Sequence, residues 1–206
     1  MTDETVSTWP PRRARTKGDK RYALIYETAA RLFHEKGYEA TTLDDLASEV
    51  GLRKGSLYHY IDSKEDLLFR IVDHTHRFFL EVVAQVVDAA RSPLDEIFAI
   101  AAAHSRFAVE NFYITSAFYS DRAALSADRR RAISRTRDAY EAKVRDLIRE
   151  GQGRGEIADD LDPTLAARGL LGMLNSIQQR HRLSKEMTPD AVAEEYSRLC
   201  VRALRP

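Results

Sequence analysis

The stretch from Thr41 to Leu68 constrains the fold most, because it contains two helix signals separated by one tight turn. Four apolar residues repeat with the spacing of one buried helix face: Leu43, Leu46, Ala47 and Val50. Gly51 follows them, where a left-handed backbone ends a helix. A second helical segment is predicted over Arg53–Tyr60, basic and aromatic on its outward side. Two helices joined in this way are typical of a helix-turn-helix, whose second helix enters the major groove of DNA.

The same part of the chain resembles a known family, the TetR-type one-component transcriptional repressors. The resemblance is close over the first third of the chain and rests on four segments: Phe33–Tyr38, Ala40–Thr42, Gly55–Tyr60 and Ser63–Leu68. Two residues depart from the family pattern. Arg53 stands where a small polar residue is usual, which bears on the bases that are read. Ile61 stands where Phe is usual, which bears on packing.

Helical periodicity continues to the C-terminus without a persistent strand alternation or a fixed repeat. The sequence therefore predicts an all-α protein of about nine helices. The resemblance implies an N-terminal three-helix helix-turn-helix DNA-binding domain over residues 19–65. It also implies a larger C-terminal helical domain for ligand binding and dimerisation over residues 66–206, and a flexible basic arm over residues 1–18. A long fourth helix, predicted from Ser63 to near Ala90, would connect the two domains.

Candidate base-reading residues lie at the start of the second helix of the motif, the part that is inserted deepest into the groove. Arg53 and Lys54 can donate to O6 and N7 of guanine, and Ser56 lies close to them in the chain. Tyr58 and His59 are predicted to bond phosphates and so to fix the register of the helix. These five residues are predicted to face DNA, while Leu57 between them is predicted to face inward as a core residue.

Further DNA contacts are predicted around this helix. Gly55 allows a close approach of the backbone to DNA, and Thr42 is placed to cap the preceding helix together with Asp45. The resemblance adds phosphate contacts by Thr42 and by Lys64. The arm residues predicted to reach phosphates or the adjacent minor groove are Arg12, Arg13 and Arg15. A disordered basic tail without a role is the alternative for this arm.

An aromatic-rich stretch at Asn111–Arg122 has two interpretations, a packed core or the wall of a ligand cavity. The resemblance favours the cavity, and the predicted effector residues are Phe107, Asn111, Tyr113, Phe118, Tyr119, Tyr140 and Met173. The last third of the chain also resembles the branch of the family that senses acyl-CoA thioesters in lipid or steroid breakdown. That branch usually has a Trp-Tyr pair where this chain has Gln179–Arg182, which weakens the assignment of an acyl-CoA effector.

Two helices at the end of the chain, predicted over residues 163–182 and 188–204, each carry an apolar stripe. The first of them also has small residues that let another helix approach closely: Ala166, Ala167, Gly169 and Gly172. The sequence therefore predicts a homodimer in which both helices pack against their symmetry mates as a four-helix bundle.

No catalytic or metal-binding constellation is found in the sequence. A glycine-rich phosphate loop, HExxH, CxxC and GxSxG are all absent, and the six histidines lack metal-type spacing. We therefore expect neither an enzyme, nor a cofactor, nor a metal site. Acidic and basic residues balance at 32 each, so net charge alone gives no hint of nucleic acid. Because the N-terminus lacks the apolar core of a secretory signal and no run reaches about 18 apolar residues, we expect a cytoplasmic protein without a membrane partner.

Two functions remain open on these grounds. The first is a ligand-responsive transcriptional regulator that acts as a repressor. It would bind a palindromic double-stranded DNA operator as a homodimer and would be released by a small-molecule effector. The second is a DNA-binding protein without a small-molecule pocket, regulated by a protein partner or used architecturally. The two differ in whether Phe107–Arg122 and Tyr140 enclose a pocket or a packed core.

Overall fold

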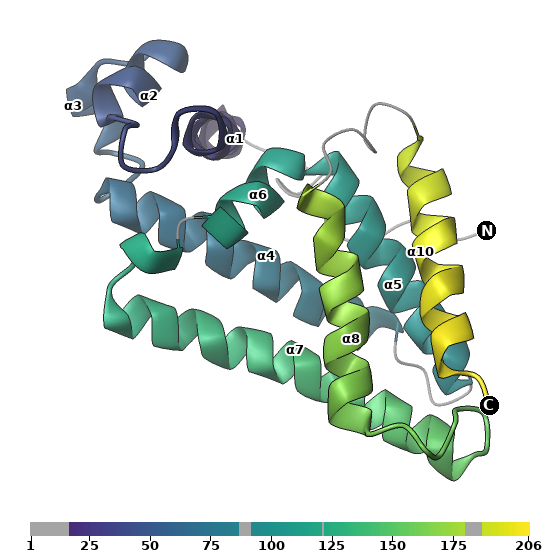
Figure 1. The fold of residues 1–206 in the computed structure, drawn as a ribbon. Coiled ribbons are helices and arrows are strands. Elements are labelled where there is room, and N and C mark those ends of the chain that lie inside the picture. Colours follow the sequence, from purple (N-terminus) through teal and green to yellow (C-terminus); the bar gives the residue numbers. More distant parts are fainter. Residues whose placement is uncertain (1–16, 87–91, 121, 180–186) are drawn as a thin grey trace. The chain divides into compact units, whose positions relative to one another are not determined.

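The computed structural model describes residues 17–86, 92–120, 122–179 and 187–206, with all side chains in these ranges except those at 17–19, 86, 118–120, 122, 178 and 179. These ranges contain nine α-helices and no strand, which confirms the prediction of an all-α protein (Figure 1). The helices are α1 (Lys17–Lys36), α2 (Leu43–Glu49), α3 (Lys54–Leu57), α4 (Lys64–Val86), α5 (Pro93–Glu110), α6 (Phe112–Ser120), α7 (Ala127–Gly153), α8 (Pro163–Asn175) and α10 (Pro189–Leu204). Two short 3-10 segments, η1 (Arg122–Ala124) and η2 (Ser176–Gln179), complete them.

The chain forms two compact units. The first contains the residues up to Phe78 together with Tyr113–Ser134, and the second contains Phe79–Phe112 and Arg135–Pro206. Helices α4 and α7 each begin in the first unit and continue into the second. The first unit thus includes α1, α2 and α3, and the second includes α5, α8 and α10.

Three helices of the second unit start where the local sequence dictates. Each of α5, α8 and α10 begins with a proline, whose fixed φ suits a first helical position: Pro93, Pro163 and Pro189. Each proline follows a residue whose side chain accepts a backbone N–H of the first turn: Ser92, Asp162 and Thr188. Such caps contribute about 1 kcal/mol each, so these starts are defined before tertiary packing.

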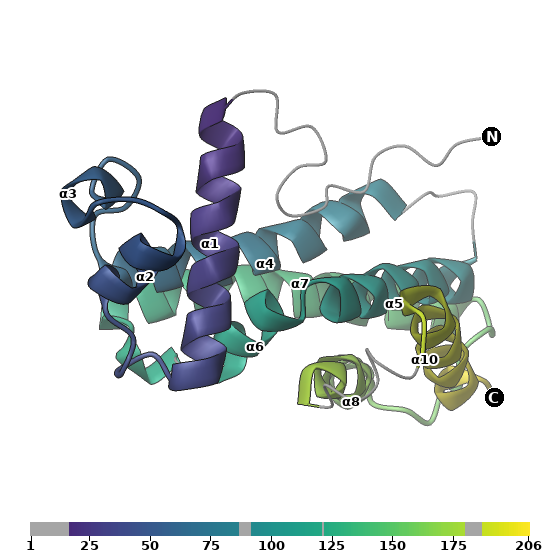
Figure 2. The same ribbon diagram turned by 90° about the horizontal axis from the view of Figure 1, so that it is seen from above.

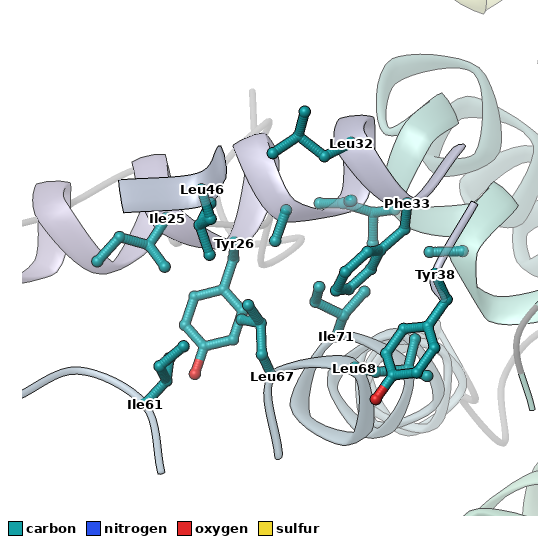
Figure 3. Close-up of a cluster of buried hydrophobic side chains, with 14 of the residues drawn as sticks. Ile25, Tyr26, Leu32, Phe33, Tyr38, Leu46, Ile61, Leu67, Leu68 and Ile71 are labelled. Atoms are coloured by element: carbon teal, nitrogen blue, oxygen red, sulfur yellow. The ribbon is translucent and has the colours of Figure 1, made fainter. Parts of the chain in front are cut away.

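The core of the first unit joins α1, α2, α3 and the start of α4 (Figure 3). Its largest fully buried side chains include Ile25, Leu32, Leu46, Leu57, Ile61, Leu67, Leu68 and Ile71. Burying a side chain of this size contributes about 1.5–3 kcal/mol relative to leaving it exposed. Because Ile61 is buried in this core, its departure from the family pattern concerns packing, as the sequence predicts.

A buried carboxylate ties the start of α4 to the start of α7 inside the first unit. Asp66 is 5% exposed and forms ion pairs with Arg70 (Nε to Oδ2, 2.7 Å) and Arg129 (Nη2 to Oδ1, 3.1 Å). Beside it, Glu65 Oε1 accepts the backbone N–H of Ser126 at 2.8 Å. A buried charge is costly unless it is paired, so loss of either arginine would leave Asp66 poorly compensated. The first turns of the two helices are therefore held together.

In the second unit α5 and α10 pack along each other, as both views show (Figures 1 and 2). An apolar cluster between them is made by Ala108, Val109, Ile177 and Val192. An exposed ion pair between Arg106 and Asp190, 2.7 Å apart, lies on the same two helices. Cys200 on α10 is fully buried, and burial raises the pKa of its thiol to about 12. The thiol is therefore protonated at neutral pH, and Cys200 is a small residue of the core.

Candidate nucleic-acid interface

The turn between α2 and α3 orients the second helix of the motif. Gly51 has a φ of +66°, in the left-handed region. A Cβ at this position would meet nothing within 4 Å, so backbone conformation and not lack of space favours glycine. The backbone N–H of Leu52 donates to the Ala47 carbonyl at 2.8 Å. From α1, Arg21 Nη1 donates to the Val50 carbonyl at 3.0 Å, so the turn is held by both preceding helices.

Helix α3 is shorter than the predicted second segment. The structure has one α-helical turn, Lys54–Leu57, followed by turns through Tyr60. Arg53 is the N-cap of this turn and not a helical residue. After Leu57 the backbone tightens, because the N–H of Tyr60 donates to the Leu57 carbonyl at 2.9 Å, across three residues. The predicted extent over Arg53–Tyr60 is wrong, since periodicity cannot separate a helix from the turns that follow it.

Burial of Leu57 determines which residues of this segment face outward. Leu57 is 0% exposed, as predicted, and packs in the core of the first unit. Its exposed neighbours are Arg53, Lys54, Gly55, Tyr58 and His59, while Ser56 is half-buried. We call these six residues the α3 surface. The three predicted base readers and the two predicted phosphate-binding residues of this segment, Tyr58 and His59, belong to it.

The two cations of the α3 surface differ in their partners. Lys54 Nζ lies 2.7 Å from Asp44 Oδ2, and this hydrogen bond raises the pKa of Lys54. The guanidinium of Arg53 has no hydrogen-bond or ion-pair partner within the part of the chain that the structure describes. Bidentate donation to guanine therefore breaks no internal contact of Arg53, whereas Lys54 must first leave Asp44.

Thr42 caps α2, as predicted. Its Oγ1 accepts the N–H of Asp45 at 3.0 Å, and Asp45 Oδ2 accepts the N–H of Thr42 at 2.9 Å. Hydrogen bonds from the side chain and backbone of Thr42, and one from Lys36, lower the pKa of Asp45 to about 2. Thr42 itself is exposed at the start of the helix, and its predicted phosphate contact stays a prediction.

Replacing Asp45 by Asn is expected to remove a pH-dependent part of the stability. The folded pKa of Asp45, about 2, is below its ordinary value of 3.8, so the carboxylate stabilises the fold above that value. This contribution is lost as the pH falls toward the folded pKa. Urea midpoints of wild type and Asp45→Asn should differ at about pH 6 and converge near pH 2. A difference of the same size at both pH values would contradict the assignment.

The remaining predicted DNA contacts are placed differently. Lys64, the first residue of α4, is half-buried, and its ammonium donates to backbone carbonyls of Tyr38, Glu39 and Thr41. Its predicted phosphate contact stays a prediction. Three arm residues lie outside the described residues, so their DNA contacts stay predictions too: Arg12, Arg13 and Arg15.

Two predicted effector residues, Phe107 and Tyr140, come together in the second unit around Phe79. The Phe79 ring stacks on His104 with centroids 4.0 Å apart, and on Tyr140 at 5.6 Å. It meets Phe107 edge-on at 5.4 Å. His104 Nδ1 lies 3.2 Å from the hydroxyl of Tyr140, and all four side chains are buried. These four residues, which we call the ring cluster, combine largely apolar side chains with one polar pair.

The other predicted effector residues are placed differently. Asn111 Nδ2 donates to the Phe107 carbonyl at 3.1 Å, at the end of α5. Tyr113 belongs to the first unit, where its ring lies 5.6 Å from that of His34. Met173 is half-buried on α8. Two further side chains lie outside the described residues: Phe118 and Tyr119.

A small apolar pocket lies elsewhere in the second unit, between α5, α7, α8 and α10. It is lined by Ile97, Ile100, Ala101, Val144, Leu170, Leu171, Leu174 and Cys200. None of the predicted effector residues lines it. Because its lining offers no polar surface, this pocket suits an aliphatic group and cannot by itself orient a ligand.

The described ranges contain neither a membrane-spanning helix nor a cluster of metal ligands. None of the helices there combines the length and apolar character needed to cross a bilayer. The same ranges hold no group of three or more His, Cys, Asp or Glu side chains placed to bind a metal ion.

Sequence reasoning missed two members of the ring cluster, Phe79 and His104. Phe79 is one of many apolar residues on the predicted fourth helix, and the spacing of His104 bears only on metal binding. One signal was available, since His104 precedes Phe107 by three residues and such pairs share a helix face. Its pairing with Tyr140, 36 residues away, has no local signal.

Two family models match the sequence. The model described as "Bacterial regulatory proteins, tetR family" matches residues 25–71. The model described as "Tetracyclin repressor-like, C-terminal domain" matches residues 90–204. Together they cover both the helix-turn-helix and the helices of the second unit.

Individual proteins are similar over most of the chain. The HTH-type transcriptional repressor KstR2 of Mycolicibacterium smegmatis is 30% identical over 146 residues, which are 70% of this chain and 71% of that protein. The TetR family transcriptional regulator PfmR from Thermus thermophilus has a TM-score of 0.79 and 33% identity, covering 86% of this chain and 97% of its own. AibR, in complex with isovaleryl coenzyme A and operator DNA, has a TM-score of 0.72 and 27% identity, covering 90% and 98%. The first two are named as transcriptional regulators, and none is named as an enzyme.

Proposed function

Because the chain belongs to the TetR family of bacterial transcriptional regulators, we propose that it is a ligand-responsive repressor that binds a palindromic operator as a homodimer and is released by a small-molecule effector. The observation that carries this proposal is the α3 surface. Fully buried Leu57 fixes the segment in the core, and the predicted base readers and phosphate-binding residues face outward around it. A rigid anchor beneath exposed donors is what reading a groove requires.

Each part of the chain has a role in this proposal. Residues 1–18 form a basic arm, residues 19–65 bind DNA, and residues 66–206 bind the effector and dimerise. Arg53 reads a base, while Tyr58, His59 and Thr42 hold phosphates. The protein works in the cytoplasm, where bacterial DNA lies, and acts by binding, without a cofactor or a catalytic step.

Arg53→Ala is expected to weaken operator binding by about 1–3 kcal/mol and to relax the preference at one base position of each half-site. The physical reason is the loss of a bidentate donor that has no competing partner among the described residues. The operator is an inverted repeat with half-site centres about 34–36 Å apart or slightly more. Fluorescence anisotropy with a set of single-base operator variants measures both effects.

Lys54→Ala is the matched control for Arg53→Ala, because it removes a neighbouring cation whose ammonium already bonds Asp44. A smaller loss of operator affinity is expected for Lys54→Ala. In wild type, Lys54 must break its bond to Asp44 before it contacts DNA, so its contact contributes less net free energy. Equal losses on operator and on random DNA for Arg53→Ala would remove Arg53 from the base-reading residues.

The homodimer is proposed to form through the outward faces of α8 and α10. Leu165 on α8 is 68% exposed and Leu199 on α10 is 48% exposed, so each helix carries a large apolar side chain on its outward face. On the same side of α8, Gly169 and Gly172 are exposed, and a Cβ at either would meet nothing within 4 Å. Their small size therefore serves no contact inside the described chain, and it supports close approach of a second copy.

The effector is proposed to bind at the ring cluster. AibR, at 27% identity, is described with both isovaleryl coenzyme A and operator DNA, which supports a short acyl thioester as the first candidate class. The hydroxyl of Tyr140 or an N–H of the His104 imidazole can donate a hydrogen bond to a ligand carbonyl inside apolar walls. Phe79 lies on α4, and the first residue of α4, Lys64, bonds the carbonyl of Thr41 ahead of α2. A ligand that displaces Phe79 therefore acts on the helix that is bonded to the start of the helix-turn-helix.

One observation favours the alternative, a DNA-binding protein regulated by a protein partner. The four rings of the ring cluster are buried and already in contact with one another, as in an ordinary packed core. An effector at this site has to separate them. Binding of a small molecule that changes operator affinity distinguishes the two functions, because a packed core without a ligand has no such response.

A further inference from the structure

The ammonium group of Lys64 is enclosed by backbone carbonyls. Its Nζ donates to the carbonyl oxygens of Tyr38 at 2.9 Å, Glu39 at 3.3 Å and Thr41 at 3.1 Å. The same Nζ lies 4.3 Å from the centroid of the Tyr38 ring, in a cation–π contact. Lys64 is the first residue of α4, so this group joins α4 to the segment between α1 and α2.

These contacts use the whole donor capacity of the side chain. An alkylammonium group has three N–H donors and no acceptor. Three carbonyls occupy three donors, and an aromatic ring covers part of the remaining surface. A phosphate oxygen could be bonded only if one of the internal hydrogen bonds broke.

The segment that Lys64 holds determines where α2 begins. Gly37 ends α1 with a φ of +85°, and the hydroxyl of Thr41 donates to the carbonyls of Leu32 (3.2 Å) and Gly37 (2.8 Å). Thr42 then caps α2. The hydroxyl of Thr41 thus ties the segment to α1, while Lys64 ties it to α4. The position of α2, and of the α3 surface that follows it, depends on both ties.

We propose that Lys64 is a positioning residue that acts through the carbonyls of Tyr38, Glu39 and Thr41, and that it does not bond a DNA phosphate in the operator complex. The proposal rests on the DNA-binding function proposed above and changes the role that the family resemblance assigns to this lysine. Lys64 could raise DNA affinity in two ways, by attraction of its charge to a phosphate or by holding α2 and the α3 surface in position. The two contributions respond differently to salt.

The test compares Lys64→Met with wild type over a series of salt concentrations, on operator DNA and on random DNA. Each phosphate contact contributes about 0.9 to the slope of log K against log salt concentration, so loss of a phosphate contact flattens the slope by that amount. A positioning role predicts that the slope is unchanged. Affinity for the operator should fall about tenfold or more, the factor expected for one charge-assisted hydrogen bond. Affinity for random DNA should fall less. A slope flattened by about 0.9, with equal losses on both DNAs, would overturn the proposal.

Lys143→Met is the control for removal of one positive charge, because Lys143 is exposed on the part of α7 that belongs to the second unit. It should change neither the slope nor the operator preference. Far-UV circular dichroism and dimer mass establish that each variant is folded. If wild type binds no inverted-repeat DNA at all, the proposed function fails, and this outcome differs from a wild type that binds while Lys64→Met flattens the slope.

A second measurement uses the unmodified protein and so does not depend on folding of the variant. In protein labelled with 15N-lysine, the Lys64 ammonium should show slow hydrogen exchange before DNA is added, because its three donors are occupied. Addition of operator should leave its resonance nearly unchanged. Rapid exchange without DNA, or a large shift when operator is added, would contradict the proposal.

Discussion

Gly172→Trp is expected to produce a folded monomer that has lost tight operator binding. Gly172 is exposed on α8, and a Cβ there meets nothing within 4 Å, so a side chain can leave the backbone toward solvent on a single chain. In the proposed dimer the same position faces the second copy, and the added ring prevents close approach of the helices. A monomer binds one half-site alone, without the α3 surface of a second copy tethered to it. Its apparent operator affinity should therefore fall about 10²–10⁴-fold. Light scattering and operator anisotropy on the same sample measure both effects.

Two other glycines provide controls for this variant. Gly153→Trp places the same ring at an exposed position near the end of α7, where a Cβ also meets nothing within 4 Å, and it should leave the dimer intact. Gly151→Trp should instead damage the fold, since a Cβ there would lie 2.5 Å from Ile157 Cδ1. A Gly172→Trp protein that remains dimeric would show that the interface lies elsewhere.

The second large effect is expected from the effector. A ligand that binds the DNA-incompetent state more tightly by about 1–3 kcal/mol should weaken operator binding about 5- to 150-fold. By linkage, operator DNA must weaken the ligand by the same factor. Short acyl-CoA thioesters are the first compounds to titrate, with operator binding followed by anisotropy and ligand binding followed by calorimetry, each with and without the other partner.

Tyr140→Phe tests the location of the effector site. It removes the hydroxyl that lies 3.2 Å from His104 Nδ1 and keeps the ring that stacks on Phe79. We expect weaker effector binding at unchanged operator affinity. A conservative change outside the ring cluster, Tyr196→Phe on α10, should alter neither. A ligand that binds equally well with and without operator would refute the release mechanism, whatever residues it contacts.

Features that depend on neighbouring residues could be predicted from the sequence. The capping box of Thr42 and Asp45 spans four residues, and the prolines that open α5, α8 and α10 act on the first turn that follows them. Their energies are local, so their residue types are sufficient to predict them. Burial of Leu57 follows from its place between polar neighbours on one turn of helix.

Features that depend on distant residues could not be predicted. The carbonyls that occupy Lys64 lie 23 to 26 residues before it, and no sequence pattern indicates that a lysine will bond main-chain oxygens instead of facing solvent. His104 and Tyr140 are likewise brought together only by packing of the second unit. The length of α3 was missed for a different reason, because a single α-helical turn and a run of tight turns have almost the same residue preferences.

The tie between α4 and α7 has a consequence for the construction of chimeric repressors. Residues 113–134 share a compact unit with the helix-turn-helix, although they follow it in the chain by more than forty positions. A graft cut after residue 65 would transplant Glu65 without Ser126, whose backbone N–H its carboxylate accepts. New operator specificity is therefore better introduced by exchanging the few side chains of the α3 surface within the intact host. Where the whole helix-turn-helix unit is transferred to another protein, residues 113–134 have to be transferred with it.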